Sequence, residues 1–246
     1  MSPRALAVLV AEVAVTLVLA AAATLLLLVP GTVPLVDRTL VPLWATLVLR
    51  LAGVRFTATR AAELPAGPVV FAANHRSHFD IPVLWLALGR PFRFVAKREL
   101  ARIPFFGWAL RLLGHVIVDR GDSAAAQATM ARAVDRVRGG VSVLVFPEGT
   151  RGEPSRFAHE PVAPFKKGGI ILAIQAGVPI VPVAIAGTER ILPKHAIAIR
   201  PGEVRVAIGK PIPTTGLTEA DRTRLTEEVR AAIAAALDPA SAGVGG

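Results

Sequence analysis

The feature that most constrains the fold is an apolar segment that runs directly into a polar turn and then into a second apolar segment. Residues 68–73 (PVVFAA) follow Gly67, residues 74–80 read NHRSHFD, and residues 81–88 end at Gly89. This pattern predicts a buried strand, a turn and a buried helix. Open α/β sheets bind their ligands where strands end and helices begin. We therefore expect the functional site at residues 74–80.

The rest of the chain alternates between strand and helix patterns, which predicts an α/β fold with a mostly parallel sheet flanked by helices. These elements define one domain over residues 54–237, preceded by an N-terminal segment (1–53) and followed by a flexible tail (238–246). We expect strands at 54–59, 68–73, 92–96, 115–118, 141–146, 178–186, 196–200 and 203–208, and helices at 81–88, 98–113, 123–138, 164–176 and from 218 onward.

The N-terminal segment is strongly apolar. Ala5 to Val29 is 25 residues long and is broken only by Glu12, Thr16 and Thr24, which is long enough to cross a bilayer core of roughly 30 Å. A signal peptide would have a shorter apolar region, so we favour a membrane-anchoring helix. Residues 40–53 form a second apolar stretch that could complete a re-entrant or interfacial hairpin.

Charge and composition restrict the partners. The 246 residues carry a net charge of +10 and contain no cysteine, which excludes disulfides and thiolate sites. No nucleic-acid-binding motif accompanies the positive charge, so an anionic membrane surface is the better partner and we expect no nucleic acid. Only Arg4 precedes the apolar helix, which favours the cell membrane with the following domain on its cytoplasmic face.

His75 and Asp80 are the candidate chemical pair in the turn. On one regular helix, side chains five residues apart would point in different directions. The two can meet if His75 lies in the turn and Asp80 in the first helical turn, with Ser77 as the N-cap residue. His75 and His78 have the spacing of a metal pair, but no further cluster of ligands accompanies them, so we expect no metal.

Four stretches in order carry a family resemblance. They are NHRSHFD (74–80), Lys97 to Arg120 with its KREL start and DR end, FPEGTR (146–151), and VPIVPV (178–183). Together they resemble the glycerolipid acyltransferase family, whose best-known members are the 1-acylglycerol-3-phosphate acyltransferases. The resemblance covers about residues 54–210 and would make 54–237 an acyltransferase domain.

The resemblance implies acyl transfer from acyl-CoA or acyl carrier protein to the sn-2 hydroxyl of 1-acylglycerol-3-phosphate (lysophosphatidic acid), without a cofactor. His75 would be the general base and Asp80 would orient its ring. The sequence lacks a G-x-S-x-G nucleophile elbow, and no acyl-enzyme is required. Amides near 74–77 or 147–150 are both open as oxyanion donors.

The resemblance also points to residues that bind the substrate. Arg151 would grip the phosphate, with Lys97 and Arg120 from the second block. Glu148 would hold Arg151 or contact the glycerol. The remaining members of the motif, Gly149 and Thr150, are included in the predicted binding site, and Gly149 is expected chiefly to shape the turn.

Three other functions stay open at this point. The same chemistry can act on another acceptor, such as glycerol-3-phosphate, another lysophospholipid or an amino lipid. A non-catalytic protein that binds anionic lipid would need the basic residues but not His75 and Asp80. A metal-dependent phosphoesterase would need metal ligands that the sequence does not offer.

Overall fold

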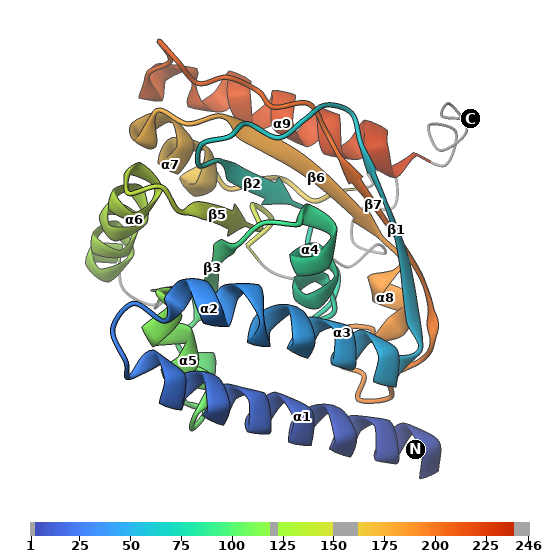
Figure 1. The fold of residues 1–246 in the computed structure, drawn as a ribbon. Helices are drawn as coiled ribbons and strands as arrows, with labels where there is room; N and C mark the ends of the chain where they lie inside the picture. Colours follow the sequence, from blue (N-terminus) through green and yellow to red (C-terminus); the bar gives the residue numbers. More distant parts are fainter. Residues whose placement is uncertain (1–2, 119–122, 150–161, 239–246) are drawn as a thin grey trace.

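The computed structural model describes residues 3–118, 123–149 and 162–238. Within them, seven strands form one sheet with helices on both faces (Figure 1). The strands stand in the order β1-β7-β6-β2-β5-β3-β4. Their bounds are Val54–Arg60 (β1), Val70–Ala73 (β2), Phe92–Lys97 (β3), Val116–Val118 (β4), Ser142–Val145 (β5), Ile180–Ala186 (β6) and Gly202–Ile208 (β7).

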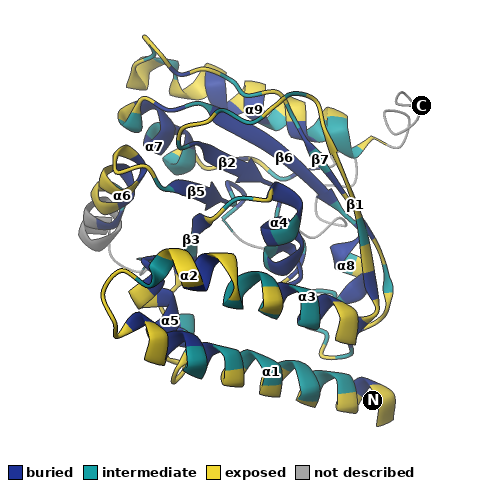
Figure 2. Cartoon of the chain, in the orientation of Figure 1, coloured by how far each residue is buried: buried dark blue, intermediate teal, exposed yellow. Residues whose placement is uncertain are grey.

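The sheet is mostly parallel, as the sequence predicts. Among the described strands only β6 and β7 pair in opposite directions. All four residues of β2 are buried (Figure 2), which suits a strand covered on both faces. β2 lies between β5 and β6, so the chain leaves it toward one side of the sheet and later returns on the other. Such a reversal opens a crevice at the carboxyl ends of the strands.

Two helical layers cover the sheet. On one face, α3 (Leu40–Ala52) and α4 (Asp80–Leu88) share a core with alternate residues of β2, including Phe71. On the other, α6 (Ser123–Arg138), α7 (Gly168–Ala176) and α9 (Arg222–Leu237) pack around Val70. Successive side chains of a strand point to opposite faces, which is why neighbours in β2 belong to different cores.

The N-terminal helices form a further layer. α1 (Pro3–Leu27) packs along α3 and against α5 (Phe106–Leu113), and α2 (Val33–Arg38) joins α1 to α3 (Figure 1). Ala23, Val36 and Leu113 meet in the small core between them. α1 has a mean hydropathy of 2.5, and of the helices described it alone is long and apolar enough to cross a membrane. The predicted apolar helix and its hairpin partner are both present.

The remaining helices are short. They are η1 (Leu100–Arg102), α8 (Thr188–Ile191) and η3 (Glu219–Asp221). The predicted strand at 196–200 is wrong, because this segment follows α8 as a turn. Ala196 N–H donates to Pro193 O, and Arg200 N–H donates to Ile191 O. Its backbone groups are therefore satisfied locally and do not pair with the sheet.

A buried ion pair ties the N-terminal layer to the sheet. Arg93 in β3 donates to both carboxylate oxygens of Asp37 in α2, at 3.0 and 2.7 Å. Their side chains are only 5% and 7% exposed. A planar guanidinium that faces a carboxylate in this way makes two parallel hydrogen bonds to it, so both buried charges are paired.

Replacing Asp37 by Ala should therefore unfold the protein more easily, because it leaves the Arg93 charge buried without its partner. We expect a loss of about 3–5 kcal/mol in the free energy of unfolding, measured by denaturant titration in detergent. The control is Arg55→Ala, which breaks the exposed pair with Glu203 and should cost under about 1 kcal/mol. Equal losses for both variants would contradict the buried pair's role.

Candidate active site

The carboxyl end of β2 holds the predicted pair. Asn74 follows the strand, and its side chain makes two hydrogen bonds with the backbone of Ile185 in β6, both 2.8 Å long. This clamp fixes where the next residue, His75, leaves the sheet. His75 Nδ1 lies 2.7 Å from Asp80 Oδ2, so the two side chains meet as predicted, with His75 in the turn and Asp80 at the start of α4.

Asp80 is fully buried and gathers donors from two parts of the chain. Its Oδ2 accepts from the amides of Arg76 and Ser77, at 2.8 and 3.0 Å. Its Oδ1 accepts from the Thr188 hydroxyl at 2.6 Å. Since Oδ2 already accepts from two N–H groups, it can only accept from His75 as well, which places the hydrogen on Nδ1. Nε2 is then the ring atom that is able to take a proton.

Ser77 has a different role from the predicted one. Phe79 occupies the N-cap position of α4, and the Ser77 hydroxyl donates to Leu192 O at 2.9 Å. The prediction failed because Asp80 turns back and takes the amides of the turn itself. Ser77 instead joins the turn to the segment after α8.

The described part of the FPEGTR motif, residues 146–149, lies against the same histidine. The Phe146 ring stacks on the His75 ring with centroids 4.1 Å apart and planes 19° apart. Glu148 Oε1 accepts from His75 N–H at 3.0 Å. Gly149 has a φ of +74°, and an added Cβ there would lie 2.8 Å from Lys166 Cε. A glycine is therefore required by the turn, as expected.

Several amides that the sequence left open as oxyanion donors already donate to other acceptors. The amides of His75, Arg76 and Ser77 already donate to carboxylates, and Gly149 N–H donates to Phe146 O.

Lys97 is exposed at the end of β3, at the same edge of the sheet as the carboxyl end of β2. The other predicted binding residues, Arg120, Thr150 and Arg151, lie outside the described residues.

The sequence did not identify three residues as direct partners of this turn: Asn74, Phe146 and Thr188. Thr188 follows Gly187 directly after the buried strand β6. A polar residue just after a buried strand was the signal that identified residues 74–80, and applied to β6 it would have found Thr188.

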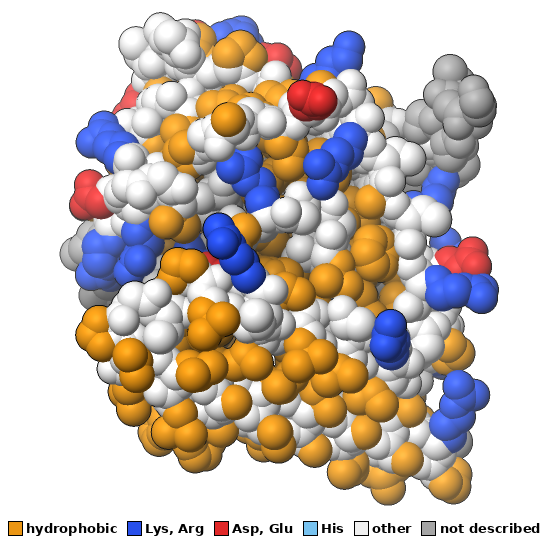
Figure 3. Space-filling view, in the orientation of Figure 1, with side chains coloured by type: hydrophobic (Ala, Val, Ile, Leu, Met, Phe, Trp, Pro, Cys, Tyr) orange, Lys and Arg blue, Asp and Glu red, His pale blue; other side chains and the backbone are white. Residues whose placement is uncertain are grey.

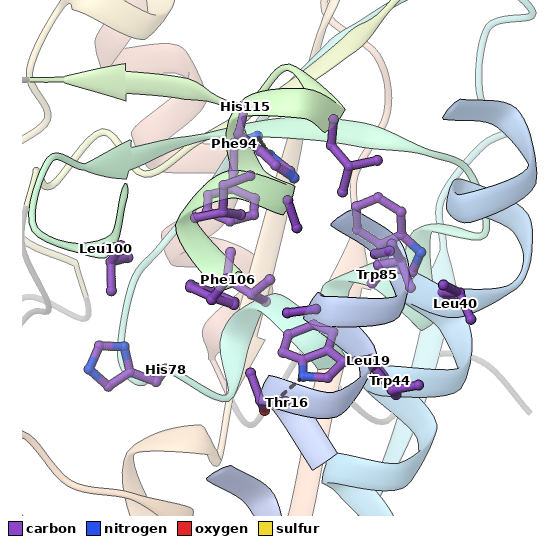
Figure 4. A pocket seen from close by; sticks show the side chains of 17 residues that line it. Thr16, Leu19, Leu40, Trp44, His78, Trp85, Phe94, Leu100, Phe106 and His115 are labelled. Atoms are coloured by element: carbon purple, nitrogen blue, oxygen red, sulfur yellow. Dashed lines mark hydrogen bonds between the residues drawn. The ribbon is translucent and has the colours of Figure 1, made fainter. Parts of the chain in front are cut away.

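An apolar cavity of about 240 Å³ opens beside the turn. In Figure 4 its walls come from the N-terminal layer on one side and from α4, β3 and α5 on the other. The residues that line it near the turn include His78, Ile81 and Trp85. Across the described ranges, no group of three or more histidine, cysteine or acidic residues is placed to hold a metal ion.

Glu148 combines burial with incomplete pairing. Its side chain is 6% exposed, and Oε2 has no hydrogen-bond partner among the described residues. Burial raises the pKa of Glu148 above 4.5, while the His75 amide, the charges of Arg76 and His75, and the Ala163 amide partly offset this effect. A carboxyl group with a raised pKa in the fold stabilises the protein at low pH and loses that contribution as the pH rises through the raised pKa.

We therefore expect Glu148→Gln to become stabilising relative to the natural protein as the pH increases above 4.5, because glutamine keeps the acceptor for His75 N–H without the buried charge. Melting temperatures measured across the pH range give the comparison. Glu228→Gln on the exposed face of α9 is the control and should follow the natural protein. A pH-independent difference for Glu148→Gln would contradict the assignment.

The chain is similar to known acyltransferases. The acyltransferase family model matches residues 55–186. A chloroplastic 1-acyl-sn-glycerol-3-phosphate acyltransferase of Brassica napus is 40% identical over 146 residues, which are 59% of this chain and 41% of that protein. The enzyme of the same name from Pseudomonas aeruginosa is 35% identical over 168 residues, which are 68% and 62% of the two chains. The chain thus spans about two fifths to three fifths of the length of these relatives.

The fold has a solved counterpart. The crystal structure of the 1-acyl-sn-glycerophosphate acyltransferase PlsC from Thermotoga maritima has a TM-score of 0.80 with 23% sequence identity, and covers 99% of this chain and 98% of that chain. At this identity the likeness concerns the fold, including the N-terminal helices. The family itself follows from the match over residues 55–186, which is more than half of the chain: this protein belongs to the acyltransferase family.

Proposed function

We propose that this protein transfers an acyl group from a thioester to the free hydroxyl of a 1-acylglycerol-3-phosphate, which yields phosphatidic acid at the membrane. The observation that carries the proposal is the His75–Asp80 pair, fixed at the carboxyl end of β2 beside an apolar cavity. The names of the relatives support the acceptor, and the chemistry of the pair supports the reaction.

The acceptor hydroxyl must lose its proton as its oxygen attacks the thioester carbonyl. His75 Nε2 takes this proton, since Nδ1 carries a hydrogen held by Asp80. The resulting imidazolium faces a carboxylate with three further donors, which stabilises the cation in place. The stacked Phe146 ring holds the plane of the imidazole. General-base help of this kind contributes about 10²–10⁴ in rate.

The collapse of the tetrahedral intermediate then breaks the carbon–sulfur bond, and the proton on His75 passes to the thiolate that leaves. No enzyme acyl group forms in this sequence of steps. The apolar cavity supplies a place for a hydrocarbon chain next to the base. The cavity suits a lipid chain, because no charged residue contributes to its lining.

We further propose that the apolar outer side of α1 rests on the membrane. Val18 and Leu25 are both 66% exposed there, and Phe105 and Trp108 are exposed at the neighbouring end of α5. Figure 3 shows hydrophobic side chains gathered over the lower part of this face and most basic side chains above it. Exposed apolar patches of this kind are typical of membrane-binding surfaces.

Replacing His75 by Gln should lower kcat by about 10²–10⁴ because the general base is lost. Asp80→Asn should lower it to a similar extent, since the ring then loses its tautomer and its charge partner. The measurement is transfer of a labelled acyl group to a panel of acceptors, read by product mass. Glu203→Gln, which alters only the exposed pair with Arg55, is the control. A His75→Gln protein with full turnover would disprove the general-base role.

The membrane surface is best tested by point changes, because removing α1 would also remove one wall of the cavity. The double variant Val18→Glu and Leu25→Glu should bind vesicles at least about tenfold more weakly, since each charge in the apolar core of a bilayer costs roughly 2.5–3.5 kcal/mol. Ala231→Glu, exposed on α9 at the far side of the sheet, should bind as the natural protein does. Unchanged sedimentation of the double variant with vesicles would argue against the proposal.

A further inference from the structure

The lining of the cavity beside the active site includes a buried histidine that the catalytic mechanism does not use. His115, just before β4, lines the cavity and is only 7% exposed. Its ring lies against Phe94 in β3, with centroids 4.1 Å apart. Figure 4 shows the two rings side by side, across the cavity from Thr16 and Trp44. A histidine in this position needs a reason, because buried polar groups are costly unless they are paired.

One nitrogen of His115 is committed to the protein. Phe94 N–H donates to His115 Nδ1 at 3.1 Å. An amide can only donate, so Nδ1 is the acceptor and the ring hydrogen is on Nε2. Burial, together with the charges of Arg93 and Arg136, holds the pKa of His115 well below its ordinary value of 6.5. The ring is therefore neutral, and its tautomer is fixed by the backbone of β3.

The other nitrogen remains available. No residue in the described ranges accepts a hydrogen bond from His115 Nε2, whereas the polar pair across the cavity is already satisfied. There, Trp44 Nε1 donates to Thr16 Oγ1 at 3.1 Å. Trp85 brings one further N–H group to the lining. His115 differs from Trp85 because the hydrogen bond from Phe94 N–H fixes the ring, and with it the direction of the Nε2–H group.

The sheet register gives the depth of this donor. Phe94 and Phe71 both pair with Leu144, so they lie at the same height in the sheet. Phe71 precedes Asn74 by three residues, and a strand rises about 3.3 Å per residue, so Phe94 lies roughly 10 Å below the edge where the catalytic turn begins. The His115 ring lies tilted against the Phe94 ring and accepts from Phe94 N–H, so it shares this depth. An acyl chain that entered from His75 would meet it part of the way along its length.

We propose that His115 is a specificity-determining residue that selects acyl chains with a hydrogen-bond acceptor, a hydroxyl or a keto oxygen, at a fixed position along the chain. This inference rests on the proposed acyl transfer and names the class of acyl donor. A plain hydrocarbon chain at this depth leaves the Nε2–H group desolvated and unpaired, which is the costly outcome. A chain oxygen at the same depth accepts the hydrogen, and the rest of the chain stays in apolar surroundings.

The test is a positional series of acyl-CoA thioesters of one chain length, with the hydroxyl moved along the chain and the plain chain as reference. For the natural protein we expect one hydroxyl position to have a kcat/KM about tenfold above that of its neighbours, because the donor is rigid and at one depth. A flat profile, or a plain chain preferred over every hydroxylated one, would overturn the proposal.

Two variants attribute the optimum to His115. His115→Asn keeps an acceptor for Phe94 N–H but removes the Nε2 donor, and should abolish the optimum while transfer of the plain chain continues. His115→Phe, which keeps an aromatic ring, should do the same. Trp85→Phe removes the other N–H group and should retain the optimum. An optimum that survives His115→Asn, or that Trp85→Phe alone abolishes, would overturn the assignment.

A second measurement separates this inference from the proposed reaction. If no thioester is transferred by the natural protein, the proposed function fails. Thermal protection of the detergent-solubilised protein by the matching free fatty acids still tests the donor. The hydroxy acid at one position should then raise the melting temperature more than the plain acid, and His115→Asn should remove the difference. Equal protection by both acids would overturn the inference even where transfer is observed.

Discussion

The site depends on the buried carboxylate of Asp80, on which four hydrogen-bond donors converge. Two are amides of the turn, one is the Thr188 hydroxyl just after β6, and one is the His75 imidazole. A carboxylate without these partners would be expensive to bury. The same network closes the turn, places the ring and selects its tautomer. The conformation of the turn and the orientation and tautomer of the His75 ring therefore all depend on the Asp80 carboxylate.

The sheet order explains why such a network can form. β2 is flanked by β5 and β6, and each neighbour brings two groups to the carboxyl end of β2. β5 continues into Phe146 and Glu148, which contact the ring and the backbone of His75. β6 continues into Thr188, and its Ile185 holds the Asn74 side chain. The reversal of strand order at β2 is what brings these three chain segments, distant in sequence, to one point.

The His75–Asp80 pair and the α/β alternation could be predicted from the sequence because both are local. The polar turn after a buried strand predicted where His75 would lie, and its five-residue spacing from Asp80 predicted that the helix must begin between them. The partners of the pair are not local: Thr188 is 108 residues from Asp80, and its position depends on which strand lies beside β2. The predicted strand at 196–200 failed for a different reason: its pattern was compatible with a strand, but the N–H groups of Ala196 and Arg200 donate locally, to Pro193 and Ile191.

The Asp37–Arg93 pair has a consequence for how this protein can be recombined with its relatives. Asp37 belongs to the N-terminal layer and Arg93 to the third strand of the sheet, and they are 56 residues apart in the chain. The two charges are buried as a pair, so the N-terminal layer and the sheet each contain one buried charge that needs the other. A chimera joined at residue 53 would inherit one charge from each parent. A grafted N-terminal layer would keep this pair only if it supplied an acidic residue at position 37, so the layer and β3 depend on each other through these two charges.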